Sequence, residues 1–150
     1  EEGKQMAPGN GRAVVHQYAN RLRERLAVEA VILFGSRARG DDVACSDYDV
    51  AVVSPSFRGM PGHGRRVLLL ELWPHPFPVD VHGFTPEEFL AIDRPLLWEV
   101  VHDGIAIVDS GVFARARELL ADKTTYGDLE RTPSGWRIAE RGDSRPPEND

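Results

Sequence analysis

The pattern of apolar and polar positions along the chain predicts a domain built from both helices and strands. Apolar side chains recur every three or four positions between residues 12 and 26, which is the spacing of one helical face. Two mainly apolar runs, at 28–34 and 48–53, have the length of buried strands, and a third β-like run covers 78–84. We therefore expect an α+β fold.

Capping residues and helix breakers mark the remaining elements. Thr85, followed by Pro86 and by Glu88, predicts a helix that starts in a capping box. The segment 54–64 is rich in proline and glycine and is expected to be a loop, whereas 124–136 fits no single element. The other apolar runs predict helices at 65–73, 94–102 and 112–121, the last one capped by Asp109 or Ser110, and a strand at 105–109.

These boundaries divide the chain of 150 residues into four parts, and the total length suits one domain. We expect a flexible N-terminus at 1–11 and a folded domain at 12–121. An extension at 122–138 is expected to pack on this domain. The charged tail at 139–150 is expected to be disordered.

The charge, apolar runs and cysteine content of the chain limit the partners and the location that we expect for it. The formal net charge of −6 argues against a general nucleic-acid-binding protein, which would carry a basic face. No apolar run is long enough to span a bilayer and no signal peptide is visible, so we expect no membrane association. The single cysteine, Cys45, excludes an internal disulfide and fits a cytoplasmic location.

The strand expected at 48–53 opens with two carboxylates, Asp47 and Asp49, on either side of Tyr48. Alternate side chains of a strand point to the same face and successive residues rise about 3.3 Å, so the two aspartates project together. Such a pair can hold two Mg²⁺ ions, which favour carboxylate oxygens and complete their shell with substrate phosphates. The alternative is a solvated strand end with acidic capping residues.

Gly35 and Ser36 end the preceding apolar strand, ten residues before the paired aspartates. Glycine lets the backbone approach a ligand closely, and the serine hydroxyl can donate to a phosphate oxygen. We therefore expect this turn to hold phosphate. Taken alone, a Gly-Ser pair has no value as a motif, and its meaning depends on the acids downstream.

Two arginines follow this turn, and guanidinium groups match phosphate oxygens in a bidentate way. Because they are two positions apart, we expect only one of them to reach the phosphates. We assign that role to Arg39 and expect Arg37 to pair with a nearby acid such as Asp41 or Asp42.

A third acid, Asp80, interrupts the β-like run at 78–84 between two valines, where a carboxylate without a partner is costly. On a strand next to Asp47 and Asp49 it would bind one metal ion and accept the proton of an attacking hydroxyl. The alternative is a strand-end aspartate bonded to a turn. His82 shares the face of Asp80 and either packs behind it or contacts the substrate.

Two further features bear on substrate choice. Arg58, Met60 and His63 of the segment 54–64 would line the rim of the site, unless this segment is a simple connector. For Trp136 we favour an anchor on the core or surface over a stack on a nucleotide base.

Gly35 and Ser36, the ten-residue spacing, the Asp-x-Asp pair and the later Asp80 together resemble the DNA polymerase β-like nucleotidyltransferase superfamily. The match covers about residues 12–110 and looks most like the minimal nucleotidyltransferases (MNT), which are often the antitoxin half of HEPN–MNT toxin–antitoxin pairs. The resemblance implies a nucleotidyltransferase fold, with a small mixed β-sheet flanked by helices.

The resemblance also implies the chemistry. ATP would donate a nucleoside monophosphate to a hydroxyl and release pyrophosphate, with two Mg²⁺ ions as cofactor. Asp47 and Asp49 would bind both ions, and Asp80 would bind one and assist the nucleophile. Gly35 and Ser36 would hold the triphosphate.

Three functions are compatible with this resemblance. The favoured one is AMP transfer to a tyrosine of a HEPN ribonuclease toxin, which silences it. The second is transfer to a small molecule, as in the aminoglycoside nucleotidyltransferases, although these usually carry a further helical domain. The third is an antitoxin that acts by contact alone, against which the three acids and Ser36 count.

Overall fold

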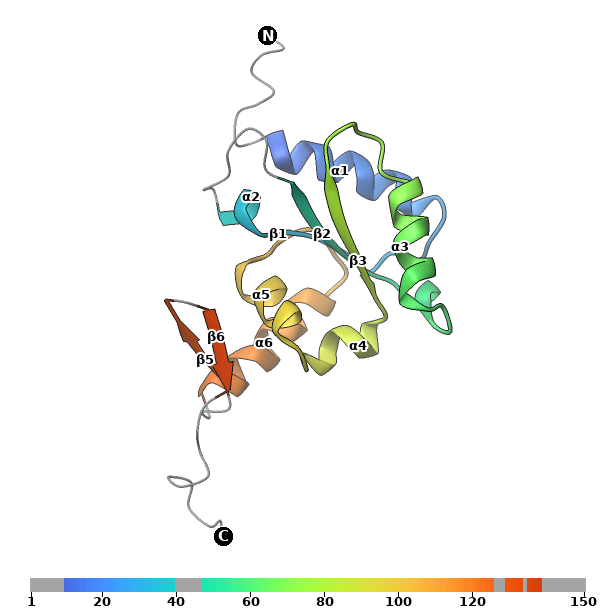
Figure 1. Cartoon of the computed structure of the whole chain (residues 1–150). Helices are drawn as coiled ribbons and strands as arrows, with labels where there is room; N and C mark the ends of the chain where they lie inside the picture. Colours follow the sequence, from blue (N-terminus) through green and yellow to red (C-terminus); the bar gives the residue numbers. More distant parts are fainter. Residues whose placement is uncertain (1–9, 40–46, 126–128, 134, 139–150) are drawn as a thin grey trace.

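A computed structural model describes residues 10–39, 47–125, 129–133 and 135–138, and its centre is a four-stranded mixed sheet (Figure 1). The strand order is β3-β2-β1-β4. The central strand β1 (Ala30–Phe34) is antiparallel to β2 (Tyr48–Val53) and to β4 (Ile105–Asp109). Strand β3 (Val79–Phe84) is parallel to β2 and forms one end of the sheet. The α+β class and the mixed sheet flanked by helices are thereby confirmed.

Helices cover both faces of this sheet (Figure 1). On one face, α1 (Asn10–Arg23) and α3 (Gly62–Glu71) form a core with the strand residues Val31, Val50 and Val81. On the other, α4 (Pro86–Ala91), α5 (Pro95–Asp103) and α6 (Val112–Thr125) form a second core with Ile32, Ala51 and Phe84. Because side chains alternate along a strand, neighbouring buried residues of β1 and β2 belong to opposite layers.

A β-hairpin follows α6, formed by β5 (Leu129–Thr132) and β6 (Gly135–Ile138). Leu129 is buried in the second core, and Trp136 packs against the same core. The segment 122–138 therefore contributes a helical turn and a hairpin that contact the domain. Helix α6 continues to Thr125, so a boundary at 121 falls inside it.

Several element boundaries differ from those expected from the sequence. Helix α1 begins at Asn10, inside the part expected to be flexible, and ends at Arg23 instead of 26. The expected loop at 54–64 contains the 3-10 helix η2 (Pro55–Phe57), which Ser54 caps, and the first residues of α3. Proline suits the first turn of a helix, so this segment contains helix starts that we interpreted as breakers.

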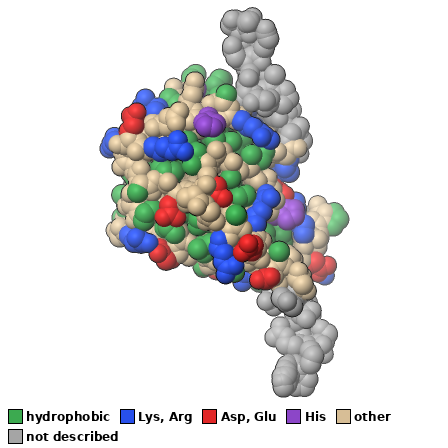
Figure 2. Space-filling model, turned by 180° about the vertical axis from the view of Figure 1, so that it is seen from behind, with side chains coloured by type: hydrophobic (Ala, Val, Ile, Leu, Met, Phe, Trp, Pro, Cys, Tyr) green, Lys and Arg blue, Asp and Glu red, His purple; other side chains and the backbone are tan. Residues whose placement is uncertain are grey.

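Local capping agrees closely with the sequence. Thr85 and Glu88 form both hydrogen bonds of the expected capping box at α4, and Asp109 accepts hydrogen bonds from three backbone amides at the start of α6. No described helix is long and apolar enough to cross a membrane. On the face of the molecule in Figure 2, positive and negative side chains are interspersed over the described surface.

Candidate active site

The carboxylates of Asp49 and Asp80 lie on adjacent strands. In the parallel pair β2 and β3 the two residues are register partners. Tyr48 and Val50 face the α1–α3 core, so Asp49 faces the opposite layer, and the same alternation around Val81 places Asp80 on that face. The second position of each strand thus carries a carboxylate toward the α4–α6 side.

Gly35 lies directly against Asp49. Phe34, the last residue of β1, is the antiparallel register partner of Asp49, and Gly35 follows it with a φ of 77°. A Cβ added at Gly35 would lie 3.0 Å from Cγ of Asp49 and would overlap with its Oδ2. The turn therefore requires glycine for two reasons, a left-handed backbone and the space taken up by a carboxylate.

Helix α2 (Ser36–Arg39) is a single turn that begins immediately after Gly35. The amides of Ala38 and Arg39 donate to the carbonyl oxygen of Gly35. The hydroxyl-bearing Ser36 is half-buried at the start of this turn. The structure thus brings Gly35 and Ser36 to the same end of the sheet as Asp49, as the spacing in the sequence predicts.

The carboxylates influence one another. The pKa of Asp49 is raised, first by burial, then by the negative charges of Asp80 and Asp47, and to a smaller extent by Glu99, while His82 opposes the shift. Burial and the neighbouring carboxylates together therefore make the negative charge of Asp49 unfavourable. A cation bound among these carboxylates would relieve it.

Asp80 is contacted by two positively charged or chargeable groups. Nη1 of Arg66 donates to Oδ1 of Asp80 at 3.1 Å, and Nε2 of His82 lies 3.1 Å from its Oδ2. The ring of His82 also packs at 6.0 Å from that of Phe34. His82 therefore both bonds to Asp80 and packs on the sheet.

Asp47 is exposed and lies just before β2. Among the described residues, no three His, Cys, Asp or Glu side chains already stand in a metal-binding arrangement, and both oxygens of Asp80 are engaged by Arg66 and His82. The donor set nevertheless fits a hard divalent cation. Two register-paired carboxylates and a third that raises the pKa of Asp49 offer the oxygen ligands that Mg²⁺ prefers.

The two arginines of α2 have different surroundings. The guanidinium of Arg37 lies 4.0 Å from the centre of the Tyr48 ring, a cation–π contact, and Asp41 and Asp42 lie outside the described residues. Arg39 is within 3.6 Å of Glu99 on α5, and both side chains are about 40% exposed. Arg39 thus lies beside the cluster, and its ion pair with Glu99 is exposed to solvent and contributes little to stability.

The structure adds two residues to the site that the sequence did not indicate. Glu99 acts on Asp49 from α5, and Arg66 reaches Asp80 from α3. Both contacts connect segments far apart in the chain, so no local pattern contains them. Of the expected rim residues, Met60 lines a pocket beside β3, whereas Arg58 pairs with Glu87.

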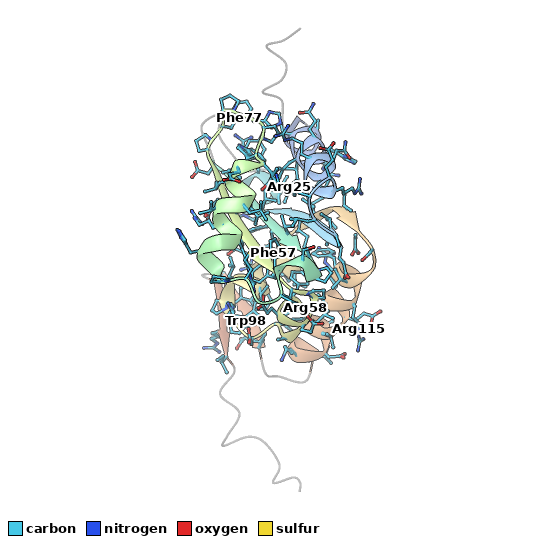
Figure 3. All side chains as sticks on the ribbon, turned by 90° about the vertical axis from the view of Figure 1, so that its right-hand side faces the viewer. Arg25, Phe57, Arg58, Phe77, Trp98 and Arg115 are labelled. Carbon is cyan, nitrogen blue, oxygen red and sulfur yellow. The ribbon has the colours of Figure 1, made fainter. Side chains whose placement is uncertain are left out.

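Trp136 lies beside α5 instead of over the carboxylates. Its ring is 6.2 Å from that of Trp98 and 5.2 Å from that of His102. It packs against the second core, as an anchoring role requires. Figure 3 shows Trp98 near the hairpin end of the molecule.

Comparison with known proteins shows that a family model matches more than half of the chain. Residues 15–102 match the model of a nucleotidyltransferase domain, a span that contains Gly35, Ser36, Asp47, Asp49 and Asp80. No curated protein matches the chain significantly.

Solved structures that are similar include a toxin–antitoxin with AMP-PNP (19% identity, 74% of this chain and 94% of that one, TM-score 0.47). Another is a MntA–HepT toxin–antitoxin (18% identity, 76% and 93%, TM-score 0.43). A third is the tri-AMPylated Shewanella oneidensis HEPN toxin in complex with its MNT antitoxin (17% identity, 77% and 94%, TM-score 0.43).

Proposed function

This chain belongs to the nucleotidyltransferase domain family, and we propose that it transfers AMP from ATP to a hydroxyl group in a Mg²⁺-dependent reaction. One observation carries the proposal. The carboxylates of Asp49 and Asp80 are register partners, and the Gly35 turn is packed against the first of them. The groups that we propose to bind phosphate and metal therefore share one end of the sheet.

In this proposal Asp47, Asp49 and Asp80 hold two Mg²⁺ ions, which when bound neutralise phosphate oxygens and make the α-phosphorus more open to attack. Gly35 allows the backbone to approach the triphosphate, and Ser36 donates a hydrogen bond to one of its oxygens. Arg39 leaves Glu99 to bind phosphate, exchanging an exposed carboxylate for a more highly charged partner.

The sheet order gives the reaction a direction. Gly35 follows β1 and Asp80 lies on β3, so they flank Asp49 on opposite sides. The acceptor oxygen would approach from the β3 side and form a bond to the α-phosphorus. The bond from that phosphorus to the bridging oxygen breaks, and pyrophosphate leaves with the electron pair on the β1 side. The hydroxyl proton passes to the carboxylate of Asp80.

For the acceptor we propose a tyrosine of a HEPN toxin, which makes this protein an antitoxin that acts by AMPylation in the cytoplasm. The support is the resemblance of the Gly-Ser and Asp-x-Asp arrangement to the minimal nucleotidyltransferases. The position of Asp49 and Asp80 beside the Gly35 turn supports catalysis over neutralisation by contact alone.

The test is a transfer assay with the purified protein, the product of the neighbouring gene and Mg²⁺, using ATP labelled at either the α- or the γ-phosphate. Transfer of the α-label alone supports adenylyl transfer, whereas transfer of the γ-label would show a kinase. The Asp47→Ala/Asp49→Ala protein is the control. Complex formation and toxin neutralisation without either label would contradict the proposal.

A further inference from the structure

A pocket of about 410 Å³ opens along the free edge of β3. Four consecutive residues of that strand line it, from Val81 to Phe84. The rest of the lining comes from α3 with the turn before it and from the segment that leads into α5, including Met60, Arg66, Arg94 and Leu96. The volume suits one large side chain and parts of its neighbours.

This pocket adjoins the carboxylate that would receive the acceptor's proton. The two residues that contact Asp80, namely Arg66 and His82, are both part of its lining. Gly35 and Ser36 lie on the other side of Asp49, beyond β2. A group that enters through the pocket therefore reaches Asp80 from the side opposite the triphosphate.

Arginines outnumber acids among the residues that line the pocket, with Arg65, Arg66 and Arg94 beside the single Glu88. The side chain of Arg65 is 12% exposed and donates hydrogen bonds to Glu88 through both Nη atoms, so the charges of this pair neutralise each other. Nη1 of Arg65 also donates to the carbonyl oxygen of Gly83. Arg66 and Arg94 remain about half exposed, at 48% and 55%. The ion pair of Arg94 is with its exposed neighbour Asp93, a contact that contributes little.

The lining also contains an apolar part, formed by Met60, Pro61, Phe84 and Leu96. Methionine adapts its shape to a ring placed against it. Two exposed apolar side chains, Val67 and Leu70, continue from Arg66 along α3. The pocket thus offers an apolar floor for a ring and cationic groups around it.

We propose that this pocket receives the acceptor as a protein segment whose reacting tyrosine is flanked by Asp or Glu residues. The inference rests on the proposed function and adds the class of acceptor to it. The tyrosine ring lies against the apolar residues, its hydroxyl faces Asp80, and the flanking carboxylates pair with Arg66 and Arg94. With a metal ion held by Asp80, Arg66 would be available to the acceptor.

Peptide binding without nucleotide tests this directly. One fluorescein-labelled peptide carries a tyrosine between two pairs of glutamates, and a second carries lysines in their place. The wild-type protein is expected to bind the acidic peptide at least about tenfold more tightly than the basic one in fluorescence anisotropy at low salt. Arg94→Glu should abolish or reverse this preference, because the reversed charge repels glutamate and attracts lysine.

A matched control is Arg115→Glu, which makes the same charge change on the exposed surface of α6. Figure 3 shows Arg115 on the other side of the molecule from α3. Unchanged peptide preference in this variant excludes a general effect of net charge. Equal binding of both peptides by the wild type, no binding of either, or an Arg94→Glu protein that keeps the preference would overturn the inference.

The outcomes separate this inference from the proposed function. Transfer of AMP to the partner at the wild-type rate by Arg94→Glu would overturn the acceptor pocket and leave the activity standing. Acidic-peptide binding that depends on Arg94, in a protein that transfers no label, would support the pocket and contradict the activity.

Discussion

Gly35 and the carboxylate of Asp49 are packed so closely that no side chain fits between them. An added Cβ would be 3.3 Å from Cβ of Asp49 and in collision with Oδ2. The turn that we propose to hold phosphate and the strand that we propose to hold metal are therefore in direct contact, and a change in one displaces the other.

Replacing Gly35 by alanine is expected to reduce transfer by at least about tenfold, because the methyl group moves Asp49 away from its position beside Asp80. Gly59→Ala is the matched control. Gly59 has a φ of 78° and no atom within 4 Å of an added Cβ, so it carries the same backbone cost of about 1 kcal/mol without the collision. Thermal unfolding and transfer are measured on both. Equal losses of activity in Gly35→Ala and Gly59→Ala would show that the close contact between Gly35 and Asp49 is not needed for transfer.

Asp49→Asn is expected to abolish transfer and yet raise the thermal stability of the metal-free protein at neutral pH. The pKa of Asp49 is raised by burial and by Asp80 and Asp47, so the folded state binds a proton more tightly than the unfolded one. Its contribution to stability therefore falls as pH rises through the window above the unfolded-state pKa, and neutral pH is the unfavourable side.

The difference between Asp49→Asn and wild type should vanish in acid, where the carboxyl is protonated in both states. Unfolding midpoints in EDTA across this pH range provide the measurement. Asp122→Asn, at an exposed position of α6, makes the same change in net charge. A destabilised Asp49→Asn protein at neutral pH would show that the carboxylate is favourably paired without metal.

Arg66→Gln is expected to raise the affinity for Mn²⁺ several-fold in the absence of nucleotide. The guanidinium engages Oδ1 of Asp80, so a metal ion must displace it, and its positive charge also repels the ion. Calorimetric titration measures the affinity, with Arg115→Gln as a control far from the site. Unchanged or weaker metal binding would show that Arg66 does not compete for Asp80.

Arg39→Ala is expected to weaken MgATP binding by roughly tenfold, whereas Arg37→Ala should change it little. Arg39 forms an exposed ion pair with Glu99, while Arg37 lies on the buried ring of Tyr48 and supports the start of β2. Nucleotide titration and thermal unfolding distinguish the two roles. Loss of affinity confined to Arg37→Ala would reverse the assignment.

Tyr18→Phe is expected to destabilise the protein by about 1–3 kcal/mol with no change in activity per folded molecule. The hydroxyl of Tyr18 donates to the carbonyl oxygen of Leu69 at 2.6 Å and joins α1 to α3 inside the first core. Burial raises the pKa of Tyr18 far above its usual range, so the donor persists at every accessible pH. Equal midpoints of denaturant unfolding for Tyr18→Phe and the wild type would contradict this prediction.

The sequence predicted those parts of the fold that depend on local interactions. The strand 48–53 and the strand 105–109 match the observed bounds, since an apolar run and its breakers define each of them. The capping box of Thr85 and Glu88 is likewise a property of four neighbouring residues. Helix ends were less accurate, since α1 begins at Asn10 and ends at Arg23 instead of covering 12–26.

The candidate site likewise contains some residues that the sequence indicates and others that it does not. Gly35, Ser36 and Asp49 come together because β1 and β2 are paired strands. The ten-residue spacing between Gly35-Ser36 and the aspartates is the sequence signal of this pairing. Asp80 could be named from its position between valines, since a carboxylate there requires partners. Arg66 and Glu99 could not, because their roles depend on how α3 and α5 pack over the sheet. The hairpin was missed because its strands are only four residues long.

The central claim is that Asp49 and Asp80 form, with the Gly35 turn, a site that transfers AMP to a tyrosine. Mass spectrometry of the neighbouring gene's product, produced together with this protein, tests it most directly. We predict AMP on a tyrosine with the wild-type protein and none with Asp80→Asn at equal complex yield. A partner that is silenced but unmodified, or modified equally with Asp80→Asn, would contradict the account.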